Sequence, residues 1–196
     1  NRNYILDWKN FQVFVFDDKG HYLHTIGKRG QGPGEYREVY DMIVDESKNQ
    51  VRLLSPFGSL YTYDLEGNFI KQNQLPEKSN YQAMEQIGDN IMTWTIPVSS
   101  DEPCITIVNA DNGKEVSSLW KGPRILNSLS GGSFYTYDGK TYFAPAFHNN
   151  EILEITEDSL KLAYKWDFGK DNIDISKYNF TLTDDNQAEE GRLMTD

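Results

Sequence analysis

The chain holds few residues of the types that carry out catalysis, and their spacing does not bring them together. His21 and His24 lie three apart in one expected strand, so their side chains face opposite sides and cannot hold one ion together. His148 stands in a loop, and for each histidine the sequence favours a surface or hydrogen-bonding role over metal ligation or general-base work. The carboxylate pairs at 17–18 and 184–185 lack the spacing of a calcium loop. We therefore expect no metal site and no cofactor.

The sequence supports nucleophilic catalysis as little as it supports a metal site. No Gly-x-Ser-x-Gly motif occurs, and Cys104 follows Pro103 at the start of an expected strand without an evident base nearby. As the single cysteine, Cys104 also excludes an intrachain disulfide and a cysteine-based zinc cluster. The sequence favours a noncatalytic protein, and an enzyme is the alternative interpretation.

A glycine-rich link runs from Gly27 to Gly34 and includes Lys28 and Arg29. Two interpretations are open, because such links can bind phosphate groups or can join strands. A nucleotide site of the Walker or dinucleotide type needs a helix N-terminus after the glycines, whereas this link leads from one expected strand into another. The pattern favours a structural crossover, in which glycines with positive φ turn the chain.

The charge balance bears on the partners. The 196 residues include 19 Lys and Arg against 30 Asp and Glu, for a formal net charge of −11. This balance repels phosphate backbones and anionic lipid headgroups, and no basic run creates a local exception. No stretch approaches the roughly 18 apolar residues of a spanning helix, and residues 1–10 lack the pattern of a signal peptide. We predict no nucleic-acid partner and no transmembrane segment in this chain.

Composition and repeats predict the elements that position these residues. The chain has 12 Tyr, 10 Phe and 4 Trp against 6 Ala, which favours strands over helices and an all-β fold. One hairpin recurs four times, and its equivalent residues Phe16, Tyr63, Val108 and Ile155 are 47, 45 and 47 positions apart. Each copy follows a further strand or strand pair, so short strands recur with a period near 46.

This period is typical of a β-propeller blade, because a four-stranded sheet of about 40 to 50 residues buries both faces only by stacking on its neighbours. We predict a β-propeller of four-stranded antiparallel blades, with about four blades in this chain, as part of a six-bladed ring. A β-sandwich is the alternative, although it would not need one hairpin at a constant period. Alternation along the strands predicts five buried core residues: Val15, Leu53, Tyr61, Ile107 and Leu153.

The repeats also divide the chain. Residues 1–169 are expected to hold the blades, with a partial first blade followed by repeats near 37–75, 79–120 and 127–169. Residues 170–196 turn polar and acidic, and we expect a further strand there and a mobile tail. Four periods are fewer than a closed six-bladed ring needs. The chain is therefore expected to be part of a larger propeller, or to close with few blades or with a partner.

The residues of the first hairpin and the link carry a family resemblance. Residues 16–27, followed by the Gly-Gln-Gly-Pro-Gly-Glu-Tyr run at 30–36, resemble the NHL-type repeats of six-bladed β-propeller proteins found in gut Bacteroidetes. The resemblance implies a six-bladed ring, export through a lipoprotein signal, and a periplasmic or cell-surface location. It supplies no catalytic motif. The related amidating lyases hold a metal with several histidines and use a catalytic Tyr and Arg, and this sequence has no matching histidine set.

The topology of a blade predicts which side binds a ligand. Loops between the second and third strands emerge on the same side of the ring as the links between blades. Arginines and aromatic residues gather in these segments, and such residues suit recognition of glycans, peptides or other proteins, in particular acidic sugars and peptide carboxylates. The predicted ligand-binding residues are Arg29, Arg37, Tyr40, Tyr81, Arg124 and His148.

Two other interpretations remain. The same residues suit blade packing and local ion pairs, which would leave no binding site on this side. A lyase or hydrolase acting in the central channel, with a metal or with carboxylates, is the alternative to a noncatalytic binding protein.

Overall fold

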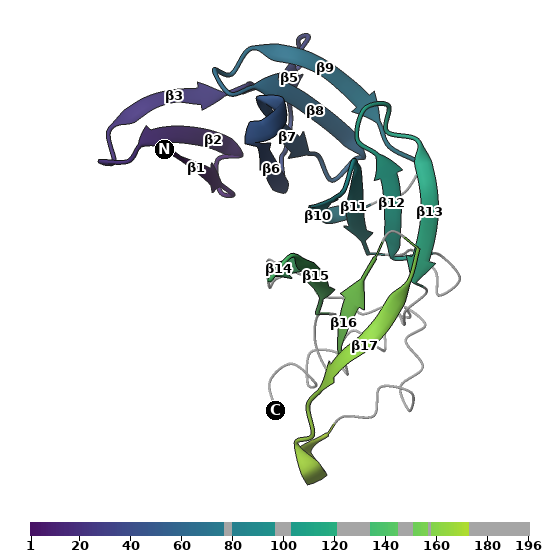
Figure 1. Cartoon of the computed structure of the whole chain (residues 1–196). Coiled ribbons are helices and arrows are strands. Elements are labelled where there is room, and N and C mark those ends of the chain that lie inside the picture. The colour runs from purple at the N-terminus through teal and green to yellow at the C-terminus, as the bar shows by residue number, and fades with distance from the viewer. Residues whose placement is uncertain (77–79, 97–102, 121–133, 145–150, 157, 173–196) are drawn as a thin grey trace, which may run out of the picture.

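The computed structural model describes residues 1–76, 80–96, 103–120, 134–144, 151–156 and 158–172 (Figure 1). Four antiparallel sheets, here called blades 1 to 4, follow one another along the chain. Blade 1 has three strands and the other blades have four, and each strand pairs with its neighbour in chain order. The strands are β1 (Arg2–Asp7), β2 (Gln12–Asp17) and β3 (Tyr22–Ile26) in blade 1; β6 (Asp41–Asp45), β7 (Gln50–Leu54), β8 (Ser59–Asp64) and β9 (Phe69–Gln74) in blade 2; β10 (Tyr81–Ile87), β11 (Asn90–Thr95), β12 (Ile105–Asn109) and β13 (Glu115–Trp120) in blade 3; and β14 (Phe134–Tyr137), β15 (Lys140–Phe143), β16 (Glu151–Ile155) and β17 (Leu160–Lys165) in blade 4.

The blades are arranged along an arc, as in a β-propeller (Figure 1). Strands β6, β10 and β14 lie on the inside of the arc, and β3, β9, β13 and β17 lie on the outside. The described residues cover a partial ring, and their only helical elements are the 3₁₀ turns η1 (Glu46–Lys48) and η2 (Gly169–Asp171). The predicted all-β fold of four-stranded antiparallel blades is confirmed. No helix among the described residues is long and apolar enough to cross a membrane.

The register confirms the repeat. Phe16, Tyr63, Val108 and Ile155 each pair with the first residue of the outermost strand of their blade. In blades 1 to 3 the pairing shifts by one residue at this position, so each outermost strand has the same β-bulge. The sequence period therefore corresponds to one structural unit.

The turns before the outermost strands are closed by acidic side chains. The carboxylates of Asp17 and Asp64 each accept backbone N–H groups from two and four residues further on, at 2.8–3.0 Å. Gly67 completes the turn of blade 2 with φ of +89°, and a Cβ there would lie 2.6 Å from the carbonyl oxygen of Thr25 in β3. Only glycine lets this turn pack so closely on the preceding blade.

The glycine-rich link folds onto its own carboxylate. Strands β4 (Lys28–Arg29) and β5 (Glu35–Tyr36) form a parallel pair, and Glu35 accepts hydrogen bonds from the N–H groups of Gln31 and Gly32 at 3.0 and 2.9 Å. The Glu35 carboxylate also pairs with the Lys28 ammonium at 2.7 Å. The N–H groups that a phosphate would need already have an acceptor, which supports the structural interpretation of this link.

The core lies between successive blades, in three clusters of buried side chains. Val15, Leu53 and Ile107 are fully buried and Tyr61 is 8% exposed, as predicted. Leu153, also predicted to be mostly inaccessible, is partly buried and packs against the third cluster.

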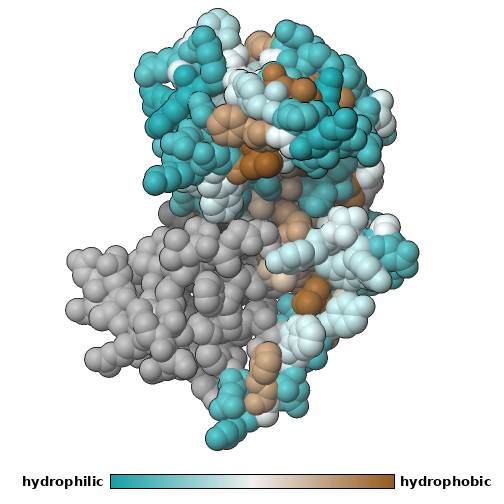
Figure 2. Space-filling view, turned by 90° about the vertical axis from the view of Figure 1, so that its left-hand side faces the viewer, coloured by the Kyte–Doolittle hydropathy of each residue, from teal (hydrophilic) through white to brown (hydrophobic). Residues whose placement is uncertain are grey.

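The exposed surface is mainly hydrophilic on the side shown in Figure 2, where apolar side chains form small separate patches. The strand and acidic tail expected over 170–196 lie outside the described residues, except for 170–172.

Candidate ligand-binding pocket

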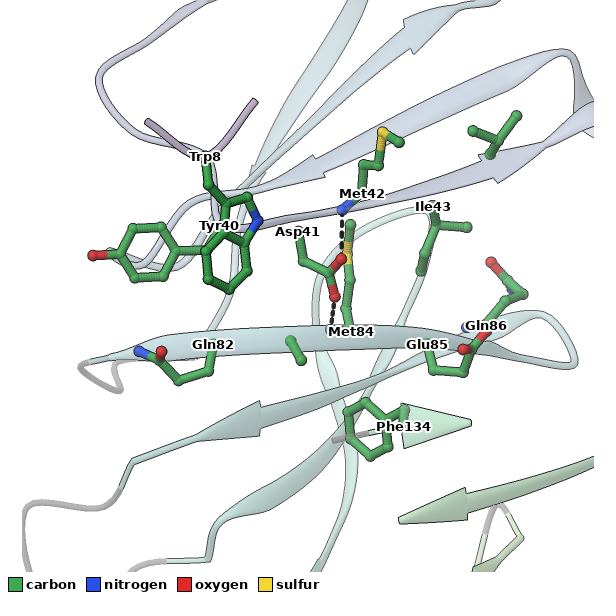
Figure 3. A pocket seen from close by; sticks show the side chains of 12 residues that line it. Trp8, Tyr40, Asp41, Met42, Ile43, Gln82, Met84, Glu85, Gln86 and Phe134 are labelled. Atoms are coloured by element: carbon green, nitrogen blue, oxygen red, sulfur yellow. Dashed lines mark hydrogen bonds between the residues drawn. The ribbon is translucent and has the colours of Figure 1, made fainter. Parts of the chain in front are cut away.

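A pocket of about 360 Å³ lies on the inner wall of the arc, between β6 and β10 (Figure 3). Residues 40–44 form one wall and residues 82–86 the other, and Trp8 from blade 1 and Phe134 from blade 4 complete the lining. All four blades therefore contribute. The volume is near the lower end of the roughly 300–1,000 Å³ typical of ligand pockets.

Asp41 joins the two walls. One carboxylate oxygen accepts the backbone N–H of Met42 and the other accepts that of Met84 in β10, both at 2.8 Å (Figure 3). The pKa of Asp41 is raised to about 6, mainly by burial and in smaller part by the carboxylate of Glu85, while the two N–H donors act in the opposite direction. Asp41 thus connects blades 2 and 3 through a hydrogen bond and also lines the pocket.

Glu85 is the second carboxylate of the pocket. Burial raises its pKa, whereas the N–H of Gln86, which donates to Oε1 at 3.1 Å, lowers it. No Lys, Arg or His from the described part of the chain lines the pocket. When ionised, the two carboxylates therefore give the described lining a negative charge, with no cationic side chain in that part of the lining.

The Gln86 amide is held in place by the wall behind it. Its Nε2 donates to the carbonyl oxygens of Gly88 and Asn90, and its Oε1 accepts from the guanidinium of the fully buried Arg52 at 3.3 Å. Arg52 also lies 3.5 Å from the carboxylate of Asp45. Gln86 is therefore fixed, as a preformed pocket wall requires.

Aromatic side chains form the rim at the end nearest the link between blades 1 and 2. The turn between β1 and β2 is held by Asp7, whose carboxylate accepts the N–H groups of Lys9 and Asn10 at 2.9 and 3.1 Å. This turn places the Trp8 side chain beside Tyr40 (Figure 3), and Trp8 is 52% exposed. An exposed indole at the mouth of a pocket offers a flat apolar surface and one N–H donor to a ligand.

Arg29 reaches the same rim through a stack of rings. Phe11 stacks on Tyr40 with ring centroids 6.3 Å apart and an interplanar angle of 16°, and the guanidinium carbon of Arg29 lies 5.3 Å from the centroid of Phe11. Phe11 has a φ of +52°, a conformation that few non-glycine residues adopt. The structure thus brings together two of the predicted residues, Arg29 and Tyr40.

The other predicted residues have different positions. Arg37 is exposed, one residue after β5. Tyr81 is fully buried, and its hydroxyl donates to the carbonyl oxygen of Pro76 at 2.9 Å, so it takes part only through packing. Arg124 and His148 lie outside the described residues.

His21 and His24 each have a local hydrogen-bond partner. His21 contacts the carboxylate of Asp17 at 2.9 Å, and His24 contacts the carbonyl oxygen of Leu65 at 3.0 Å. Cys104 is buried. Among the described residues, no three His, Cys, Asp or Glu side chains are placed to hold one metal ion.

Tyr40 is the one predicted residue in the described lining, and the residues with chemical roles that were not predicted include Trp8, Asp41 and Glu85. Trp8 stands next to a loop on the predicted side, and Asp41 is the first residue of an inner strand whose central three residues are apolar. A carboxylate in such a strand is the signal that could have indicated the pocket.

Fold and pocket together define a β-propeller with a candidate ligand site on its inner strands. The chain belongs to the family described as "Domain of unknown function (DUF4934)", which matches residues 1–195. No curated protein matches the chain.

One solved structure shows a shared fold, and two further structures are similar with lower scores. A "Putative exported protein" of Bacteroides fragilis NCTC 9343 is similar with a TM-score of 0.69 and 20% identity, over 84% of this chain and 48% of that one. The glutaminyl cyclase of Myxococcus xanthus has a TM-score of 0.43 and 15% identity, over 59% and 47% of the two chains. The computationally designed Ika8 protein has a TM-score of 0.46 and 16% identity, over 79% and 43%. The chain spans about half the length of these structures, and the first similarity shows a shared fold.

Proposed function

We propose that this protein is a noncatalytic ligand-binding β-propeller that recognises a glycan or peptide through the pocket between β6 and β10. The observation that carries the proposal is the half-exposed Trp8 at the mouth of a pocket with polar walls. Aromatic surface with a few fixed polar groups is the usual composition of sites for sugars and peptides. Residues that serve only to pack blades would be covered.

The rim extends the proposed site. Arg29 and Arg37 are exposed, and with Tyr40 they would bind a carboxylate or hydroxyl groups of the ligand. Arg124 and His148 belong to segments expected on the same side and are part of the proposal. Tyr81 supports the link between blades 2 and 3 from within the core.

The proposed location is the periplasm or cell surface of a bacterium. It is supported by the resemblance to exported Bacteroidetes propellers and by the name of the Bacteroides fragilis structure with the same fold. A lipoprotein anchor and a six-bladed ring belong to the same proposal, and the chain would then supply about four of the blades.

Glycan and peptide arrays test the binding function. The protein and its Trp8→Ala variant would be compared on the same arrays, with Trp166→Ala as the matched control. Trp166 is similarly exposed, at 55%, and follows the outer strand β17. We expect ligands that bind the unaltered protein and the Trp166 variant but lose most of their affinity for the Trp8 variant. Equal binding by all three proteins would place the site elsewhere.

A lyase or hydrolase acting in the channel is the second candidate, because perturbed carboxyl groups gather at catalytic sites. Glu85 is the better proton donor of the two, since both oxygens of Asp41 already accept backbone N–H groups. Turnover of an array ligand that Glu85→Gln abolishes, with metal analysis of the purified protein, would favour this candidate. Binding without turnover would favour the first.

A further inference from the structure

We propose that the pocket binds a protonated amine of its ligand, with Glu85 as the ion-pairing group and Trp8 as an aromatic surface of the same lining. The inference rests on the proposed binding function and names the chemistry that the pocket selects. The amine can belong to an amino sugar or to a peptide, since both present the same ammonium group.

The charge of the lining points to a cation. Asp41 and Glu85 both line the pocket, and its described lining includes no Lys, Arg or His. Burial is the largest cause of the raised pKa of each carboxyl group, and no cationic side chain among the described residues acts against it. An organic ammonium ion would supply that charge and would be disfavoured by no group of the wall.

The geometry selects Glu85 over Asp41 as the partner. Each oxygen of Asp41 accepts a backbone N–H at 2.8 Å, one of them across the two blades. Glu85 accepts one N–H at Oε1, and its Oε2 has no hydrogen-bond donor among the described residues. Glu85 can therefore receive a new donor without breaking a contact between blades.

The remaining lining suits an organic cation better than a metal ion. A hard divalent cation takes about six or more oxygen ligands, whereas the described residues form no group of three His, Cys, Asp or Glu able to hold a metal. Trp8 and Phe134 present aromatic surface, and the electron-rich face of a ring attracts an ammonium group. Aromatic and apolar walls would be of no use to a bare ion.

The rim complements this assignment. Arg29 lies over Phe11, which stacks on Tyr40 of the pocket mouth. A ligand that carries an amine and, further along, a carboxylate would use the pocket and the rim together.

The test compares matched pairs of small probes by NMR titration of the Trp8 indole N–H, whose resonance a Trp8→Phe variant identifies. Glucosamine is compared with glucose and N-acetylglucosamine, and glycinamide is compared with N-acetylglycinamide. We expect at least one amine to bind about tenfold tighter than its neutral partner, the size of one charge-assisted hydrogen bond. Preference for glucosamine alone would identify an amino sugar, and preference for glycinamide alone would identify a peptide amine.

Glu85→Gln should remove this tenfold preference, while Glu46→Gln should keep it. Glu46 is exposed in η1 and does not line the pocket, so its variant has the same change of charge without the same contact. If Glu85→Gln does not fold, the amine and neutral probes on the unaltered protein still decide the question. Neutral probes that bind as tightly as the amines would overturn the ammonium assignment. If the Trp8→Ala variant instead bound the array ligands with unchanged affinity, the proposed binding site itself would be overturned.

Discussion

The pH dependence of stability should change when Asp41 is replaced by Asn. Burial raises the pKa of this carboxyl group from 3.8 to about 6 in the folded protein, so the folded state binds a proton that the unfolded state has released between these values. The contribution of Asp41 to stability is therefore present at low pH and declines as pH rises from about 4 to about 6. A shift of about two pKa units corresponds to about 3 kcal/mol of unfolding free energy. Asn does not titrate, so this decline should disappear.

Urea unfolding between pH 4 and pH 7.5 would measure this decline. At each pH, the free energy of unfolding of the Asp41→Asn variant is subtracted from that of the unaltered protein. This difference cancels the groups that both proteins share, except for the coupling of Asp41 with Glu85. It should fall by about 2 to 3 kcal/mol over this range and then level off.

Asp17→Asn is the control with the opposite sign. Hydrogen bonds from the backbone and side chain of His21 lower the pKa of Asp17, so its contribution is present at neutral pH and declines as pH falls through the folded pKa. A flat difference curve for Asp41→Asn, or one that rises with pH, would refute the assignment of Asp41 as a buried carboxylate in the wall.

Three further predictions concern packing and the rim. Leu53→Ala should lower the free energy of unfolding by about 2 to 4 kcal/mol in urea titrations, because Leu53 is fully buried between blades 1 and 2, and a near-zero change would mean that the burial is wrong. Gly34→Ala should lower the free energy of unfolding by about 1 to 3 kcal/mol, because the φ of Gly34 is +71° and the new Cβ would lie 2.5 Å from Cγ of Phe69. An unchanged urea midpoint would contradict this contact. Arg37→Ala should weaken binding of acidic array ligands, with most of the loss at low salt, and should leave the unfolding midpoint unchanged because Arg37 is exposed; equal affinity at low salt would exclude it from the rim.

The fold could be predicted because its signals are local. The turn acids Asp17 and Asp64, and the glycine that follows each, recur with the hairpin, and they close the same turn in the structure. A repeated local unit that cannot bury both faces alone must stack, and stacking defines a propeller.

The pocket could be predicted only in part, because it depends on contacts between blades. Topology placed Arg29 and Tyr40 on one side of the ring, and the structure joins them through Phe11. Asp41 and Glu85 lie in different inner strands, and nothing local to either residue shows that packing turns both toward one space. The burial of Tyr81 was missed for a related reason, since a tyrosine near a link suits the core and the surface equally well.

Asp41 connects the stability of the ring with its proposed function. Its carboxylate holds β10 against β6 and also lines the pocket, so at neutral pH the fold retains a buried charge that costs about 3 kcal/mol relative to the unfolded chain. Replacing it with an apolar residue would remove that cost, but the N–H of Met84 would lose its acceptor and the pocket would lose part of its negative potential. A cation bound beside Glu85 would lower the pKa of both carboxyl groups and so recover part of the same free energy. A half-buried acid at the start of an inner strand is therefore a poor choice for packing alone and a reasonable one for a wall that faces a cationic ligand.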